Sequence, residues 1–157
     1  MSFSRVIVNS PVGKWGVEGS EGGVSRIVMP HEFTRASKGP IAQVVSSTAD
    51  ELSEYFAGER RTFSLALARV DATDFQRDCW RALNDIPYGD VLTYGDVALA
   101  IGRPRAARAI GNAVHVNPWP ILVPCHRVVA SNGMGGYGGG IEVKEFLLTL
   151  EECHRQD

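Results

Sequence analysis

A cysteine followed directly by a histidine, Cys125-His126, stands after an apolar run in the second half of the chain. A thiol with an ordinary pKa of about 8.5 is mostly protonated at neutral pH, so a nucleophilic cysteine needs a base to take its proton. The imidazole of His126 could take it, and a carboxylate such as Glu151 could orient the ring and stabilise the imidazolium. These residue types favour nucleophilic chemistry at Cys125.

A structural role for Cys125 is the alternative. Neighbouring residues on a strand point to opposite faces, so Cys125 and His126 meet only if the chain bends or a water bridges them. Pro124 favours such a bend, and the residues alone leave a buried structural cysteine about as well supported as a reactive one.

The other cysteines give no sign of a disulfide framework or a metal site. Cys79, Cys125 and Cys153 are odd in number and share no close spacing, which argues against paired cysteines and against zinc ligands of the CxxC kind. Cys79 falls in the apolar stripe of a predicted helix, and Cys153 has no evident partner. Free thiols indicate a reducing, cytoplasmic location.

Composition and charge restrict the class of protein. The chain has 157 residues, of which 44% are hydrophobic and 22% charged, which suits one domain with a small subdomain. We expect neither export nor membrane spanning, because there is no leader-like start and no apolar run of about 20 residues. Residues 97–141 contain no Asp or Glu but four arginines. This pattern indicates a polyanionic partner, with chance clustering on a solvated face as the alternative.

Residues 1–70 are expected to form a small α+β unit without a chemical motif, and therefore with a structural role. Turn signals separate short β-type runs, and apolar residues at helical spacing follow. The strands are predicted at residues 5–8, 16–18 and 24–28, the helix at 42–56, and a further strand at 63–67. Residues 69–73 are the expected linker to a second domain, 73–157.

The second domain is predicted to be mainly helical. A helix with the apolar stripe Phe75, Cys79, Trp80 and Leu83 begins after Thr73 or Asp74. Thr93 and Asp96 match a capping box that opens a short helix, and a second helix over 105–114 follows a turn with Gly and Pro. This pair predicts a helix-turn-helix. Residues 121–123 are expected to be extended and continued by 128–129, and residues 142–152 to form a helix whose inward residues are Val143, Phe146, Leu147 and Leu150.

The second helix of the pair has one face of polar and basic residues and several small residues. Its polar positions are Arg105, Arg108, Asn112 and His115, and the small ones are Ala107, Ala109 and Gly111. Small side chains let the helix backbone lie close to another surface, and arginines attract phosphate, so this face suits a phosphate-lined groove. Packing inside a helical bundle is the alternative. A segment with six glycines in residues 133–140 also allows close approach of a ligand, and it lacks the Lys-Ser/Thr of a P-loop.

The segment Pro124-Cys125-His126-Arg127-Val128 resembles the active-site signature of the O6-alkylguanine-DNA alkyltransferases, also called methylated-DNA–protein-cysteine methyltransferases. Further segments follow in the order of that family across residues 73–151: Phe75-Gln76 with Trp80, Ile86-Pro87-Tyr88-Gly89, Thr93-Tyr94-Gly95-Asp96, Arg108-Ala109-Ile110-Gly111-Asn112-Ala113, Asn117-Pro118, Gly136-Tyr137 and the helix from Lys144 to Glu151. The resemblance implies an α+β fold, with an RNase H-like N-terminal subdomain and a helical alkyltransferase domain.

The resemblance also implies a role for each site residue. Cys125 would accept the alkyl group from guanine oxygen-6, His126 would take its proton through a water with Glu151 behind it, and Asn117 would brace the turn by bonding backbone. Tyr94 would protonate the departing guanine. The carbonyl of Val123 or Cys125 and the backbone of Gly138 would read the base edge. The expected pocket residues are Val123, Val128, Tyr137, Gly138, Pro120 and Trp119. Many family members have Ser at the place of Gly138, so a hydroxyl contact is absent here.

The implied partner is double-stranded DNA, bound through its minor groove with the target base rotated out of the helix. Arg108 would fill the vacated space. The implied DNA-binding residues are Arg108, Ala106, Ala107, Ala109, Gly111, Thr93, Arg103 and Ser131. We expect a monomer that can assemble cooperatively on DNA, and activity that extends to O4-alkylthymine.

The resemblance implies no cofactor. It also implies no metal, because residues 1–70 contain no cysteine to match the zinc site of some relatives. A thioether product has no route to hydrolysis, so each molecule would react once. The alternatives are a lesion sensor like the alkyltransferase-like proteins, which lack the acceptor cysteine, a helix-turn-helix transcription regulator, and a thiol hydrolase.

Overall fold

The computed structural model describes residues 3–32, 34–64 and 66–155. Contacts within the chain divide it into two compact units, Met1–Val70 and Asp71–Asp157. The expected α+β class is confirmed, with a small antiparallel sheet in the first unit and most of the helices in the second.

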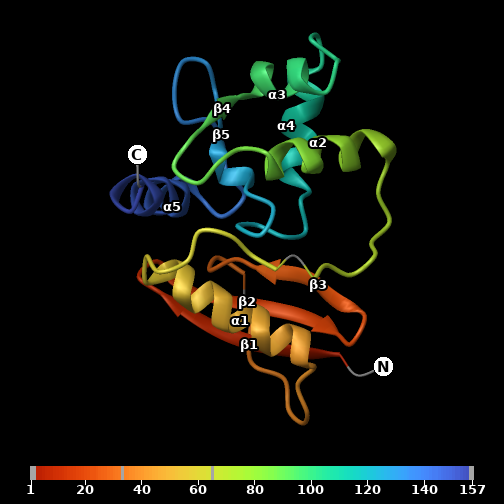
Figure 1. Cartoon of the computed structure of the whole chain (residues 1–157), viewed down its shortest axis with the longest axis vertical. Helices are drawn as coiled ribbons and strands as arrows, with labels where there is room; N and C mark the ends of the chain where they lie inside the picture. The colour runs from red at the N-terminus through yellow and green to blue at the C-terminus, as the bar shows by residue number, and fades with distance from the viewer. Residues whose placement is uncertain (1–2, 33, 65, 156–157) are drawn as a thin grey trace. The chain divides into compact units, whose positions relative to one another are not determined.

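The first unit is a three-stranded antiparallel meander with one helix packed across it (Figure 1). Its elements are β1 (Ser4–Ser10), β2 (Gly13–Ser20), β3 (Gly23–Val28) and α1 (Gln43–Phe56). The three predicted strands and the predicted helix are confirmed. Val45 and Leu52 of α1 are fully buried, as are Trp15, Val17 and Ile27 of the sheet, so the apolar stripe of the helix and one face of the sheet form the core of this unit.

The predicted strand at 63–67 is wrong where it can be compared, and Leu65 lies outside the described residues. Leu67 makes only an isolated bridge to Val24 of β3, whose N–H donates to Ala66 O at 2.8 Å and whose carbonyl accepts from Ala68 N at 2.8 Å. Both hydrogen bonds involve the single residue Val24, so the described residues of 63–67 do not form a continuous strand ladder with β3. Gly23 permits this close approach, because a Cβ there would lie 2.6 Å from the Ala68 nitrogen.

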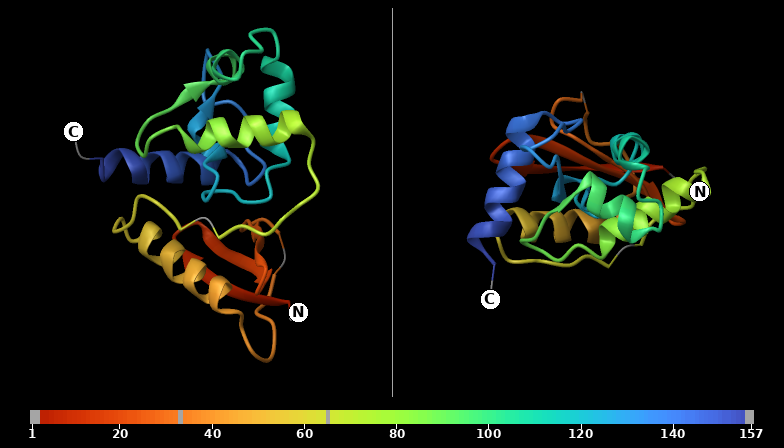
Figure 2. Two further views of the ribbon diagram at one scale, coloured as in Figure 1. Left: turned by 45° about the vertical axis from the view of Figure 1, so that its right-hand side comes forward. Right: turned by 90° about the horizontal axis from the view of Figure 1, so that it is seen from above.

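The second unit contains α2 (Asp74–Asn84), β4 (Leu92–Thr93), α3 (Tyr94–Ala100), α4 (Ala107–His115), β5 (Val128–Val129) and α5 (Ile141–Cys153). Helices α2, α3 and α4 pack together, and α5 lies apart from them (Figures 1 and 2). Both predicted caps form: Thr73 accepts from Gln76 N at the start of α2, and Thr93 accepts from Asp96 N at the start of α3. None of the helices among the described residues is long and apolar enough to cross a membrane.

The α3–α4 pair forms the predicted helix-turn-helix, but its second helix begins later than expected. Helix α4 starts at Ala107, and Ala106 is its N-terminal flanking residue with φ of −97° and ψ of 20°. Pro104 fixes its own φ and has no N–H, so the residues after it form a turn before the helix begins. Arg105 and Ala106 therefore precede the helix rather than lie on it.

The expected extended run over residues 121–123 is also wrong. Ile121 has φ of 75°, a value rare for a β-branched residue, and residues Cys125–Arg127 form one turn of 3-10 helix. Pro120 and Pro124 lack the N–H that a strand ladder needs. The chain becomes extended only at β5, which pairs in parallel with β4 through Leu92–Val128 and Thr93–Val129. This pairing ties the segment after Cys125 to the start of α3.

Candidate active site

Cys125 is held at the start of the 3-10 helix by an asparagine that bonds backbone. Asn117 Nδ2 donates to Val123 O at 2.9 Å, and its Oδ1 accepts from Trp119 N at 3.0 Å. Cys125 N donates to the same Val123 oxygen at 2.7 Å. Asn117 thus joins both ends of the irregular segment, the geometry expected of a brace.

The two bonds to Val123 O bear on which carbonyl can read a base. A carbonyl oxygen has two lone pairs, and those of Val123 are taken by Asn117 and Cys125. The Cys125 carbonyl accepts from Val128 N, and among the described residues no second donor to it is found. Of the two carbonyls expected to contact the base edge, the geometry favours Cys125.

The Cys125 thiol is buried and protonated in this resting state. Cys125 is 4% exposed, and its Sγ lies 4.0 Å from the Tyr137 hydroxyl. Burial raises the pKa of Cys125, although hydrogen bonds from Asn117 and Tyr137 and the charge of Lys144 oppose the rise. The thiol therefore needs both a base and an opening of its surroundings before it can react.

His126 and Glu151 have the arrangement expected of a base and its orienting carboxylate. His126 Nε2 and Glu151 Oε2 lie 2.6 Å apart, and both side chains are buried. The 3-10 turn, rather than a strand, carries Cys125 and His126, so they are not forced onto opposite faces. Among the described residues there is no direct Cys125–His126 hydrogen bond, and His126 Nδ1 is buried without a partner. A buried acceptor of this kind suits a bridging water.

Arg127 is a site residue that the sequence analysis missed. Its Nε donates to Glu151 Oε1 at 2.8 Å and its Nη2 to Glu151 Oε2 at 3.0 Å. Although burial opposes ionisation of Glu151, His126 and Arg127 outweigh it and hold the Glu151 pKa far below its ordinary value. Burial lowers the pKa of His126 against the pull of Glu151. The directions of both shifts favour a neutral imidazole beside a carboxylate.

Lys144 is a second missed residue. Its buried Nζ donates to Val128 O at 2.7 Å and to Gly136 O at 3.1 Å, so it links β5 to the glycine-rich segment. Burial lowers the pKa of Lys144 to about 8. On α5 the buried positions include Lys144, Leu147 and Glu151, whereas Phe146 and Leu150, predicted to point inward, are only half-buried. The i, i+3, i+7 spacing of Lys144, Leu147 and Glu151 is the signal that could have revealed Lys144.

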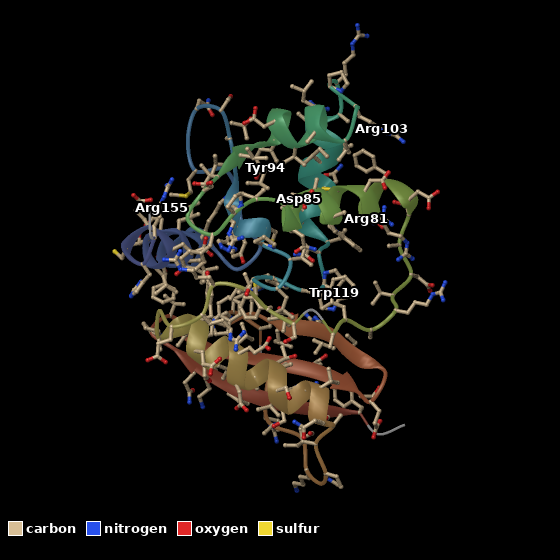
Figure 3. The ribbon with its side chains drawn as sticks, viewed as in Figure 1. Arg81, Asp85, Tyr94, Arg103, Trp119 and Arg155 are labelled. Atoms are coloured by element: carbon tan, nitrogen blue, oxygen red, sulfur yellow. The ribbon has the colours of Figure 1, made fainter. Side chains whose placement is uncertain are left out.

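Tyr94 begins α3 and meets the glycine-rich segment. Figure 3 shows Tyr94 at α3 and Arg103 at the turn between α3 and α4. A Cβ at Gly135, where φ is +76°, would lie 3.0 Å from the Tyr94 hydroxyl, so glycine permits this contact. Burial raises the pKa of Tyr94, although bonding to the Gly136 backbone opposes the rise. The phenol therefore keeps its proton at neutral pH and can donate it.

The residues expected to contact DNA lie at the α3–α4 surface and in nearby loops. Arg108, Ala109, Asn112 and His115 are exposed on α4, and Ala107 and Gly111 are half-buried. Ile110 and Ala113 form the buried side of α4. Arg103 is exposed, with its guanidinium carbon 5.6 Å from the centre of the Phe75 ring. Ser131 is exposed, and Thr93 serves as the α3 cap.

Of the expected pocket residues, Tyr137 has a direct contact with the thiol. Val128 is buried beside Lys144. Trp119 packs edge-on against Trp80 of α2, with 5.8 Å between ring centres. Pro120 is buried and Gly138 exposed. The described residues contain no group of three or more His, Cys, Asp or Glu side chains suited to a metal ion.

A surface groove of about 730 Å³ borders Glu151 on the side of the Ile86–Asp90 turn. Asp85 and Arg155, both labelled in Figure 3, are among its lining residues. Cys125 is not among its lining residues. The groove therefore gives no access to the thiol.

Comparisons with known proteins identify the family of the chain. The family model described as the DNA-binding domain of 6-O-methylguanine DNA methyltransferase matches residues 74–153. A methylated-DNA–protein-cysteine methyltransferase of Methanosarcina barkeri is 41% identical over 156 residues, which cover 93% of this chain and 95% of that protein. The crystal structure of the Mycobacterium tuberculosis O6-methylguanine methyltransferase is 37% identical, with a TM-score of 0.84 over 99% of this chain and 96% of that one. That of the M. tuberculosis OGT in complex with DNA is 39% identical, with a TM-score of 0.84 over 96% and 93% of the two chains. The chain belongs to the methylated-DNA–protein-cysteine methyltransferase family.

Proposed function

We propose that Cys125 is the alkyl acceptor in this protein and that its substrate is O6-alkylguanine in double-stranded DNA. DNA repair by alkyl transfer to a protein cysteine is the activity of the family, and DNA is the partner. The observation that supports the acceptor assignment is the buried Cys125 thiol on the turn braced by Asn117, directly before the His126–Glu151 pair.

The chemistry is a single displacement. The Cys125 sulfur forms a bond to the alkyl carbon as the bond between that carbon and guanine oxygen-6 breaks. The thiol proton passes through a water to His126 Nδ1, which has no partner among the described residues, and Tyr94 donates a proton to the departing guanine. The products are a thioether and an unmodified guanine. A thioether carbon–sulfur bond resists hydrolysis, so each molecule reacts once.

The target base must leave the duplex to reach the thiol, which costs a few kcal/mol of stacking. The exposed face of α4 suits a minor-groove contact, because its small residues admit the backbone and Arg108 can fill the space that the base leaves. We infer that the glycine-rich segment shifts when the base enters, because Tyr137 covers a sulfur on a residue that is 4% exposed. We expect a cytoplasmic monomer that can assemble on DNA and that also accepts O4-alkylthymine.

The test is to incubate the protein with duplex DNA that contains O6-methylguanine labelled on the methyl group, then to digest the protein and map the label by mass spectrometry. We expect the label on Cys125, rising to one methyl per protein molecule and no further. Repeated turnover would instead indicate a hydrolase. Tight binding to the lesion without label would indicate a sensor.

Arg108→Ala is expected to slow repair of duplex DNA by about ten- to a hundredfold while slowing the reaction with free O6-benzylguanine much less. Only the duplex substrate requires extrusion of a base, and Arg108 is exposed on α4, where it can stabilise the vacated stack. The measurement is the single-turnover rate constant on each substrate.

Arg105→Ala is the matched control for that experiment, because it removes the same charge from the turn just before α4. It should weaken DNA binding in a salt-dependent manner without changing the ratio of the two rates. Equal losses on both substrates in Arg108→Ala would exclude the wedge role of Arg108.

A further inference from the structure

The Glu151 carboxylate accepts hydrogen bonds on both oxygens. Among the described residues, Oε1 accepts from Arg127 Nε at 2.8 Å and Gly89 N at 3.1 Å, and Oε2 accepts from His126 Nε2 at 2.6 Å and Arg127 Nη2 at 3.0 Å. A carboxylate offers about four lone-pair directions. These donors fill them, so the carboxylate can neither rotate nor readily bind a proton.

We propose that Arg127 is a positioning residue for alkyl transfer: its two-pronged hold on Glu151 leaves one oxygen direction for His126 Nε2–H and thereby keeps His126 Nδ1 unprotonated, ready for the thiol proton. This inference rests on the proposed function of Cys125. It assigns Arg127 a part in setting the protonation of His126, beyond ion pairing in the core.

Arg127 is itself fixed in place, which such a role requires. Its Nη1 donates to Ile86 O at 2.7 Å, and its guanidinium carbon lies 5.7 Å from the centre of the Tyr88 ring. The residue is buried. Because the turn after α2 holds one end of the guanidinium, the other two nitrogens meet Glu151 in a fixed orientation.

The charges around His126 support the same role. Glu151 and Lys144 approach from α5, and Cys125 and Arg127 flank His126 on its own turn. Cys79 of α2 stays neutral, because burial raises its pKa to about 11.

Arg127 compensates the charge of Glu151, and both Arg127 and Lys144 lower the pKa of His126, as burial also does. Without Arg127, the uncompensated carboxylate would favour imidazolium, which cannot accept the thiol proton.

The test compares single-turnover alkyl transfer to Arg127→Gln, Arg127→Lys and wild type between about pH 5.5 and 9. The acid limb is the fall of the transfer rate at low pH, where His126 becomes protonated. In Arg127→Gln we expect this limb to move to higher pH. At a given pH on the limb, the rate of the variant should then be about tenfold below that of wild type for each pH unit of the shift. Arg127→Lys keeps the charge, so its acid limb should stay near the wild-type pH. The maximal rate above the limb should be lower, because the two-pronged contact with Glu151 is lost. Adding Glu151→Gln to Arg127→Gln should return the limb toward lower pH.

The amplitude of a single-turnover reaction counts the folded, competent molecules, so a folding defect is separated from a change in rate. Arg81→Gln, at an exposed arginine of α2, is the control and should match wild type in both quantities. An acid limb of Arg127→Gln that coincides with that of wild type, whatever its amplitude, would show a purely structural role and overturn the proposal. The proposal is also overturned if the acid limb of the Arg127→Gln, Glu151→Gln double variant stays at the higher pH of Arg127→Gln. Label found away from Cys125 in wild type would instead refute the proposed function.

Discussion

Cys125→Ser is expected to slow alkyl transfer at least about a thousandfold, equivalent to about 4 kcal/mol of activation free energy, while leaving DNA binding and folding intact. A serine hydroxyl is far harder to ionise than a thiol, and the neutral His126 beside it lacks the basicity to compensate. The hydroxyl is slightly smaller than the thiol, so the turn held by Asn117 should persist. Label transfer and fluorescence anisotropy with lesion-containing duplex DNA measure the two properties.

Cys153→Ser is the matched control, because Cys153 is an exposed free thiol near the end of α5. It should transfer the label as wild type does. Survival of transfer in Cys125→Ser, or its loss in Cys153→Ser, would contradict the assignment of the acceptor. If Cys125→Ser lost DNA binding as well, the separation of binding from chemistry would be wrong.

The elements that the sequence predicted well are those that depend on neighbouring residues. The cap at Thr73, predicted there or at Asp74, and the Thr93–Asp96 capping box are formed by residues close in sequence, and the α1 stripe repeats at the helical period. The segment around Cys125 was predicted less well because its conformation depends on contacts across it. Asn117 bonds Val123 O, and Ile121 adopts a positive φ that its residue type disfavours.

The same distinction applies to the site. Cys125, His126 and Glu151 could be selected from residue chemistry and resemblance. Residue type did not select Arg127 and Lys144, because charged residues are rarely buried unless paired, and only the spacing along α5 marks Lys144. The partners that pair them are far along the chain: Arg127 bonds Glu151 on α5 and Ile86 after α2, and Lys144 bonds Val128 and Gly136. Periodicity alone does not identify such partners.

Glu151→Ala is expected to reduce the free energy of unfolding by about 3–5 kcal/mol and to abolish efficient transfer. The substitution leaves the buried Arg127 guanidinium without its carboxylate and the Gly89 N–H without its acceptor. It also removes the group that orients His126. Urea unfolding at pH 7 measures the loss. Glu152→Ala, at the exposed neighbouring position, should change stability by less than about 0.5 kcal/mol; a similar loss in both variants would contradict the account.

The loss caused by Glu151→Ala should also depend on pH in a defined direction. The folded-state pKa of Glu151 is depressed far below its ordinary value of 4.5, so its contribution to stability is present above that value and declines as the pH falls below it. The stability difference between wild type and Glu151→Ala should therefore shrink by about 1.4 kcal/mol per pH unit below about 4.5. Urea unfolding of both proteins between about pH 7 and 3 measures this. A difference that stays constant over that range would mean that Glu151 contributes through packing rather than through its charge, and would remove the electrostatic basis for its pairing with Arg127 and His126.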